Sequence, residues 1–206
     1  MLDAETILAD VMTQDWASCG NAAVLNLTPF RQLSAPRQRQ LLSAWMKGED
    51  LYRPAFDMVQ RLFDEVIESK VDAQAALHWN HYYYVRYQQQ LFRVSKTEYL
   101  SEQFQTIESI EQRFSLDQAY GFASGKFRID TQKYGLSSAL LEQPLQIKPR
   151  LGGEKLHLYG RVGAWPLKKA IQSAQIFPWQ RHTIQILSID IVMNGVFTPK
   201  GFWLVE

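Results

Sequence analysis

The hydrophobic period of the sequence changes near residue 75, and this change limits the possible folds more than any other feature. Before it, apolar residues recur every three or four positions over 1–17, 34–47 and 54–69, which predicts three amphipathic helices with a short strand at 22–27. After it, residues 75–96 are dense in aromatic and β-branched side chains and predict two or three antiparallel strands. Helices followed by a small meander predict an α+β unit over residues 1–97.

The rest of the chain predicts a second small domain. Residues 98–144 are interpreted as a partly stranded connector with a hairpin turning at Ser124-Gly125. Residues 145–206 predict a mostly-β domain with one main helix over 167–174 and three closing strands. The sequence therefore predicts an α+β protein of two small domains.

Positive charge gathers in one segment of a nearly neutral chain. The formal net charge is +1, yet seven Lys or Arg and a single acid, Glu154, lie between Leu145 and His182. A local basic field of this size suits a polyanion partner. A solvated surface whose charges are balanced by acids folded nearby explains the count equally well.

The sequence shows no self-contained active site. It has neither a phosphate-binding loop nor a Gly-x-Ser-x-Gly elbow, its four histidines lack metal-ligand spacing, and Cys19 is the only cysteine. No secretory signal and no apolar run of membrane-spanning length is visible. We therefore expect a soluble cytoplasmic protein with no catalytic residue, metal site or membrane contact in this chain.

Within the basic segment, the stretch from Gly152 to Lys169 is the best candidate for anion binding. Its glycines allow close backbone approach, and a helix beginning near Pro166 directs its positive end at a ligand. Lys168 and Lys169 in the first turn are unfavourable for the helix, and a phosphate would offset that conflict. Trp165 and Trp179 are interpreted as core residues.

Several motifs of this segment together resemble the C-terminal domain of bacterial tRNA(Ile)-lysidine synthetases. They are Arg150-Leu-Gly-Gly-Glu, Gly160-Arg161, Leu167-Lys168-Lys169, Pro178-Trp179-Gln180-Arg181 and Gly195-Val196-Phe197, in that order. Residues 20–100 are similar to the substrate-recognition domain of the same family, with Arg86 and Tyr87 on its Arg-Tyr strand. The resemblance covers most of the chain.

The resemblance implies a tRNA-binding role on behalf of an enzyme. The family ligates lysine to C2 of the wobble cytidine of isoleucine tRNA, which carries a CAU anticodon. Its N-terminal ATP-pyrophosphatase domain uses ATP with magnesium and carries a Ser-Gly-Gly-x-Asp-Ser motif, which this sequence lacks. We therefore expect a fragment that positions tRNA, holds no cofactor and is inactive alone. The candidate RNA-binding residues are Arg86, Arg150, Lys155, Arg161, Lys168, Lys169 and Arg181.

Two other functions remain open at this point. The chain could be a protein-interaction or dimerisation module without RNA binding, using the aromatic strands around His81–Tyr87 and an edge strand at Gly201–Glu206. A homodimer is compatible with either reading. A pocket for a small anion at the Gly152–Lys169 loops is a third option, with the least support.

Overall fold

The computed structural model describes residues 2–70, 75–101, 107–133, 135–157, 162–189 and 192–205 of the chain. The chain divides into two compact units, Met1–Tyr99 and Leu100–Glu206, called here the first and second unit. Each unit combines helices with antiparallel strands, which confirms the predicted α+β class.

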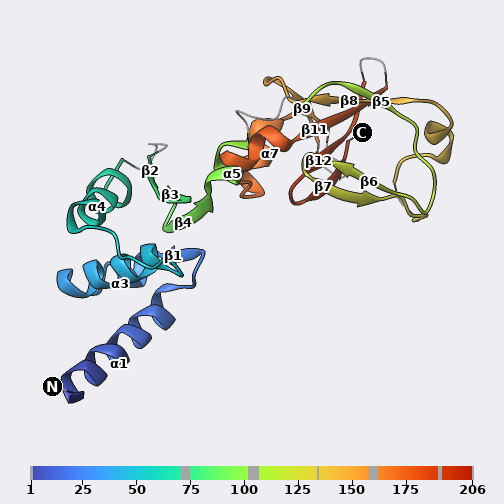
Figure 1. Cartoon of the computed structure of the whole chain (residues 1–206). Coiled ribbons are helices and arrows are strands. Elements are labelled where there is room, and N and C mark those ends of the chain that lie inside the picture. The colour runs from blue at the N-terminus through green and yellow to red at the C-terminus, as the bar shows by residue number, and fades with distance from the viewer. Residues whose placement is uncertain are drawn as a thin grey trace. The chain divides into compact units, whose positions relative to one another are not determined.

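Helices form one layer of the first unit (Figure 1). They are α1 (Leu2–Cys19), the single turn α2 (Leu27–Phe30), α3 (Ala35–Lys47) and α4 (Phe56–Arg61), which continues as the wider π-helix η1 (Leu62–Ile67). A short α5 (Lys96–Tyr99) follows the sheet. The sequence predicted a single regular helix over 54–69; instead the helix widens after α4, where the N–H of Glu68 donates to the carbonyl of Phe63 at 2.9 Å. No helix in the described ranges is both long and apolar enough to cross a membrane.

The boundaries of α3 follow from its sequence. Ser34 precedes it in an extended conformation, and a proline occupies its first turn, where the missing N–H costs no hydrogen bond. The helix ends at Gly48, whose φ of 50° favours glycine. A Cβ at Gly48 would also collide with the guanidinium of Arg93, because that side chain packs directly against the end of α3.

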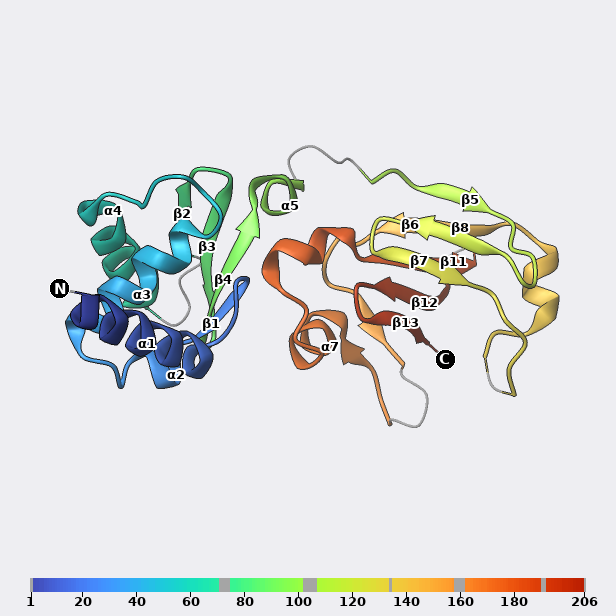
Figure 2. The ribbon, with the colours of Figure 1, turned by 60° about the horizontal axis from the view of Figure 1, so that its bottom comes forward.

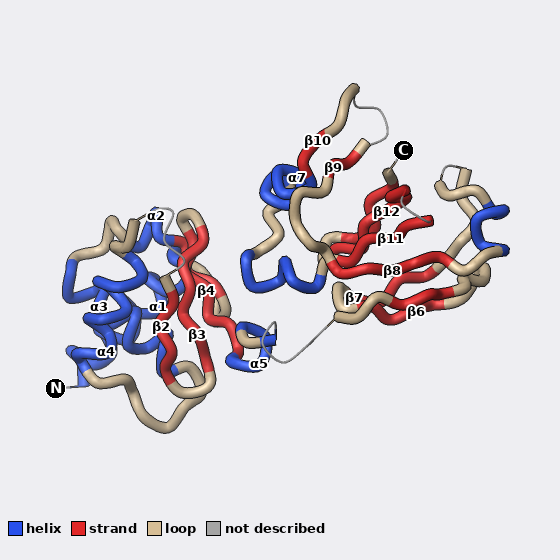
Figure 3. The backbone as a smooth tube through the Cα atoms, turned by 90° about the horizontal axis from the view of Figure 1, so that it is seen from above, coloured by secondary structure: helices blue, strands red, loops and turns tan. Residues whose placement is uncertain are grey.

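The strands of the first unit form one antiparallel sheet. Its order is β1 (Val24–Asn26), β4 (Gln90–Ser95), β3 (Tyr82–Tyr87) and β2 (Ala76–Trp79). Two-residue turns join β2 to β3 and β3 to β4, and each contains a residue of positive φ, Asn80 at 50° and Gln88 at 55°. Alternate residues of the strands, among them Leu77, Tyr84 and Leu91, face the helices and share their core. Figure 3 shows α1, α3 and α4 together on one side of this sheet.

The second unit is built on a five-stranded antiparallel sheet. Its order is β13 (Gly201–Leu204), β12 (Val192–Thr198), β11 (Gln185–Ile189), β8 (Leu145–Pro149) and β5 (Ile110–Gln112). Two smaller pairs are the hairpin β6 (Ala119–Phe122) with β7 (Gly125–Arg128), and β9 (Lys155–Leu156) with β10 (Trp165–Pro166). The helices in the described part of this unit are η2 (Ser138–Glu142), α7 (Leu167–Ser173) and η3 (Pro178–Thr183), the last two of which flank residues 174–177. Residues interpreted as a connector thus supply β5 to this sheet and the whole hairpin.

The two faces of the five-stranded sheet are covered by different elements. Phe197 of β12 and Leu187 of β11 face the β6–β7 hairpin, and the rings of Phe122 and Phe197 lie 4.3 Å apart between centroids. The adjacent residues Val196 and Ile186 face the opposite way and share a core with α7. Figure 2 shows the hairpin lying against the sheet. Because successive strand residues point to opposite faces, one strand serves both cores.

A buried tyrosine hydrogen bond should contribute measurably to the first unit. Tyr84 is fully buried, and its hydroxyl donates to the carbonyl of Met46 at 3.2 Å. Burial raises the pKa of this phenol, so it remains a donor. Tyr84→Phe leaves that carbonyl without its partner, and we expect a loss of about 1–3 kcal/mol in the free energy of unfolding of the first unit.

The measurement is urea denaturation monitored by hydrogen-exchange mass spectrometry. Peptides from β2 to β4 report the stability of the first unit separately from that of the second. Tyr52→Phe is the control, because Tyr52 is 76% exposed and should leave stability unchanged. Equal stability of the two variants would show that the bond contributes nothing.

Candidate nucleic-acid interface

Two short strands and a helix bring three of the predicted cations together in the second unit. Lys155 lies on β9, which pairs with β10 immediately before α7. The backbone N–H of Leu167, the first residue of α7, donates to the carbonyl of Glu154 at 2.8 Å and ties the helix to β9. Lys168 and Lys169 follow in the first turn of the helix. We call Lys155, Lys168 and Lys169 the basic corner.

The pattern of α7 directs the lysines of the basic corner to solvent. Leu167, Ala170 and Ile171 are buried, whereas Lys168 and Lys169 between them are exposed. This spacing places the apolar side chains on one helical face and the two ammonium groups on the other. Lys155 is also exposed. Within the described ranges, none of the three lysines forms an ion pair.

The first turn of α7 therefore carries positive charge without compensation. It contains no acidic side chain, and its cap residue Pro166 makes no side-chain hydrogen bond. The unpaired N–H groups at a helix N-terminus add a partial positive charge to that of the lysines. An anion at this end would relieve the repulsion.

Arg150 differs from the lysines because it has an internal partner. Its Nε lies 3.5 Å from Oε2 of Glu154, with the two side chains only 22% and 12% exposed. The other carboxylate oxygen, Oε1, accepts from the backbone N–H groups of Leu151 and Gly152, each at 2.6 Å. Glu154, the single acid of the basic segment, thus holds the backbone at Leu151 and Gly152 in place and neutralises Arg150.

Arg181 forms a hydrogen bond with the backbone of its own segment in the second unit. It lies half-buried in η3, and its Nε donates to the carbonyl of Ile176 at 3.1 Å. Phe177 and Trp179 precede it in the chain and stack on each other, with ring centroids 4.9 Å apart and planes 8° apart. Trp179 is 7% exposed and Trp165 packs partly buried against the core of α7, so both lie where the sequence predicted.

Arg86 belongs to the first unit, whereas Arg150, Lys155, Lys168, Lys169 and Arg181 belong to the second. It sits half-buried on β3 and donates to the carbonyl of Ile67, the last residue of η1. Arg31 donates to the same carbonyl at 3.3 Å and to Gln89 at 2.8 Å. Both guanidinium groups thus cap a helix C-terminus, where cations are favourable. The remaining candidate, Arg161, lies outside the described residues.

Metal-ligating side chains do not cluster beside these cations in the described part of the chain. Three or more His, Cys, Asp or Glu side chains that could share a metal ion are not found there. Cys19 is buried, and burial raises the pKa of its thiol, which disfavours the nucleophilic thiolate. The exposed lysines of the basic corner can bind an anion through their charge.

Two family models match the chain, one in each unit. Residues 25–92 match the TilS substrate binding domain and residues 145–191 match the TilS substrate C-terminal domain. The chain is 59% identical over 208 residues to the tRNA(Ile)-lysidine synthase of Acinetobacter baylyi, covering 100% of this chain and 45% of that protein. Likeness to the same enzyme of Xanthomonas campestris is 28% over 186 residues, covering 90% of this chain and 41% of the relative.

The tRNA(Ile)-lysidine synthase of Escherichia coli O157:H7 is also similar, with 25% identity over 208 residues that cover 97% of this chain and 46% of that protein. The chain thus spans less than half the length of these relatives. Both matched models describe domains of one family, and they fall in the two units that the structure separates. The chain belongs to the tRNA(Ile)-lysidine synthase family.

Proposed function

We propose that this chain is the tRNA-binding portion of a tRNA(Ile)-lysidine synthase. The observation that carries the proposal is the basic corner, where three exposed lysines have no carboxylate partner among the described residues. Double-stranded RNA is contacted largely through its phosphates and 2′-hydroxyls. Three exposed ammonium groups carried by β9 and the first turn of the adjoining α7 are suited to a phosphate backbone.

In the proposed enzyme, lysine is ligated to C2 of the wobble cytidine of an isoleucine tRNA with a CAU anticodon, at the expense of ATP. ATP and magnesium belong to an N-terminal ATP-pyrophosphatase domain of the enzyme, and this chain alone is inactive. Its own residues bind and orient the tRNA in the cytoplasm. The exposed lysines of the basic corner support this division of labour, because they offer charge for binding a polyanion.

The proposed contacts supply affinity more than selectivity. Phosphate contacts fix register and orientation but carry no sequence information. Recognition of one tRNA therefore depends on the shape that spans several contacts, with the basic corner as one of them. Binding through lysines also falls steeply with salt, because counterions leave the RNA when ammonium groups approach it.

Reversing the charge of the basic corner should flatten the salt dependence of tRNA binding. In the double variant Lys168→Glu with Lys169→Glu, we expect the slope of log affinity against log salt to fall by roughly 0.7–0.9 for each lysine that contacts a phosphate. The measurement is fluorescence anisotropy of labelled isoleucine tRNA between 50 and 200 mM salt, about the range in which such contacts dominate.

The matched control is Arg113→Glu with Lys126→Glu, which changes the net charge equally at exposed positions of the same unit. This control should keep the wild-type slope. If the two double variants bind alike, a general charge effect explains the loss and the basic corner is not an RNA site.

Glu154 should lower the affinity of the chain for RNA, because its carboxylate neutralises Arg150. Glu154→Gln keeps an oxygen for the Leu151 and Gly152 amides but removes the charge that holds the guanidinium. We expect tRNA to bind about two- to fivefold more tightly at low salt, since one more cation becomes available. Glu142→Gln, an exposed carboxylate of η2, is the control. Unchanged affinity would place Arg150 outside the interface.

A second candidate function is dimerisation, which the position of β13 favours. This strand forms one edge of the five-stranded sheet, so its outer backbone groups are available to another strand. Analytical ultracentrifugation across the same salt range distinguishes the two functions. A salt-insensitive dimer with no RNA affinity would support dimerisation and overturn tRNA binding.

A further inference from the structure

Three hollows of the first unit lie along α3, and each shares at least one lining residue with the next. The first, of about 110 Å³, lies between α3 and the α4–η1 helix and is lined by Arg39, Val59 and Phe63 among others. The second, of about 320 Å³, shares Arg39 and Val59 and adds Arg53 and Phe56. The third, of about 390 Å³, shares Arg53 and continues to Arg93. We call this series the α3 groove.

The charge of the α3 groove is predominantly positive. Arg39, Arg53, Lys47 and Arg93 line it, against the single carboxylate of Glu49. A lining of this kind is complementary to an anion.

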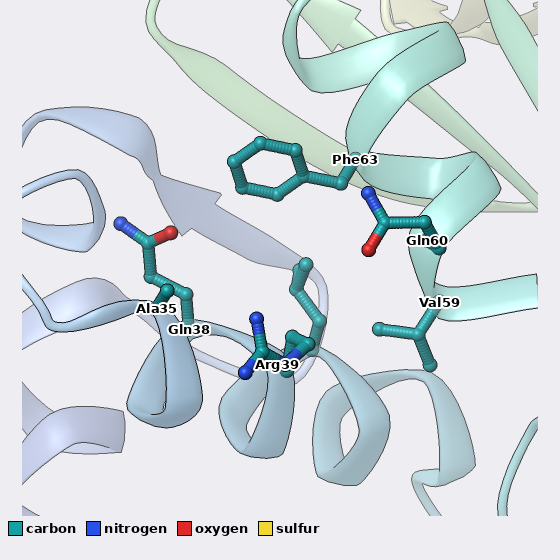
Figure 4. A pocket seen from close by; sticks show the side chains of 7 residues that line it. Ala35, Gln38, Arg39, Val59, Gln60 and Phe63 are labelled. Carbon is teal, nitrogen blue, oxygen red and sulfur yellow. The ribbon is translucent and has the colours of Figure 1, made fainter. Parts of the chain in front are cut away.

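Arg39 is the central cation of the groove. Its side chain is half-buried and lines two of the three hollows, yet within the described ranges it forms no ion pair. Figure 4 shows it reaching from α3 into the hollow that Val59, Gln60 and Phe63 line from the opposite helix. A guanidinium recessed between two helices without a carboxylate is a charge that a ligand can satisfy.

The second hollow is lined by apolar as well as polar side chains, and one of them is an exposed aromatic ring. Pro36, Pro54 and Val59 line it, and Phe56 is 70% exposed although it is large and apolar. Nucleic-acid bases stack on exposed aromatic side chains and gain about 1–3 kcal/mol per base. A volume of 320 Å³ lies at the lower end of the roughly 300–1,000 Å³ of small-ligand sites, which suits a single nucleotide.

We propose that the α3 groove binds unpaired nucleotides of an RNA strand. Phosphates lie beside Arg39 and Arg53, and a base packs against Phe56. This inference rests on the proposed function and extends it: the basic corner meets an RNA backbone in the second unit, whereas the α3 groove takes nucleotides whose bases are unstacked. The three hollows follow one another, so the strand continues past a single nucleotide. An acidic protein segment would also satisfy the arginines, but it leaves the exposed ring of Phe56 without a stacking partner.

The experiment uses the full chain and a fluorescein-labelled unpaired RNA oligonucleotide of seven residues, with binding followed by anisotropy. We expect Arg39→Glu and Phe56→Ala each to weaken binding about tenfold, the equivalent of about 1.4 kcal/mol. Lys126→Glu is the charge control, because Lys126 is exposed on β7. Tyr52→Ala is the aromatic control, because Tyr52 is 76% exposed and does not line these three hollows. Thermal melting by circular dichroism checks that every variant folds.

Competition identifies the occupant. A self-complementary RNA duplex and a glutamate-rich peptide are added separately to the bound oligonucleotide, and we expect neither to displace it at matched charge. Displacement by the duplex shows that the bases need not be unpaired, and displacement by the peptide indicates an acidic protein partner; either result overturns the proposal. Absence of oligonucleotide binding overturns it as well.

The two proposals fail separately in these measurements. If Arg39→Glu and Phe56→Ala bind the oligonucleotide as wild type does while the Lys168 and Lys169 double variant loses tRNA affinity, the groove is wrong and the tRNA-binding function stands. If the groove variants lose the oligonucleotide while tRNA binding ignores the basic corner, the groove holds and the corner is the part that fails.

Discussion

The burial of one face of α7 is the interaction on which the basic corner depends. Leu167, Ala170 and Ile171 enter the core that also receives residues of β9, β11 and β12. Burying a large aliphatic side chain contributes about 1.5–3 kcal/mol. An unfavourable cation in the first turn of a helix costs only about 0.3–1 kcal/mol. The apolar residues therefore set the orientation of the helix, and Lys168 and Lys169 must face water with their charge uncompensated.

A count of Lys and Arg in a segment overstates the charge available to a polyanion, because some of these side chains pair with groups of the protein itself. Arg150 and Glu154 lie four residues apart, and the carboxylate is already held in place by two backbone amides of its own loop. The Glu154 carboxylate is therefore already fixed in position when Arg150 pairs with it, so less conformational entropy is lost when the ion pair forms. Arg86 and Arg181 are engaged by backbone carbonyls in a similar way. The three lysines of the basic corner form no ion pair in the described ranges. This difference separates them, as candidates for RNA binding, from the arginines that stabilise the fold.

Local patterns predicted the elements whose cause is local. The start of α3 after Ser34, its end at Gly48 and the amphipathic α7 follow from spacing and turn residues. The β6–β7 hairpin was also predicted, although it turns at Ala123-Ser124, one residue before the predicted Ser124-Gly125. The joining of β5 to β8 depends on residues more than thirty positions apart and has no signature in either strand. The contact of Arg86 with the carbonyl of Ile67 is likewise a tertiary outcome. The α3 groove was missed for the same reason, since Arg39 and Phe56 become neighbours only when α4 packs on α3.

The two candidate surfaces differ in the type of cation that they present, and this difference has physical consequences. A lysine ammonium is a compact, strongly hydrated charge on a flexible stem, suited to phosphates whose positions vary along a backbone. Its exposure leaves it subject to screening, which at physiological salt acts over about 8 Å. An arginine guanidinium is planar, weakly hydrated and able to stack, and Arg39 is recessed where screening is weaker. A recessed arginine beside the ring of Phe56 discriminates by shape, since a base can enter only if it has left its helix. Salt therefore acts mainly on the contact made by the lysines, while unpairing of the RNA controls the contact made in the groove, so the two contacts respond to different properties of the same molecule.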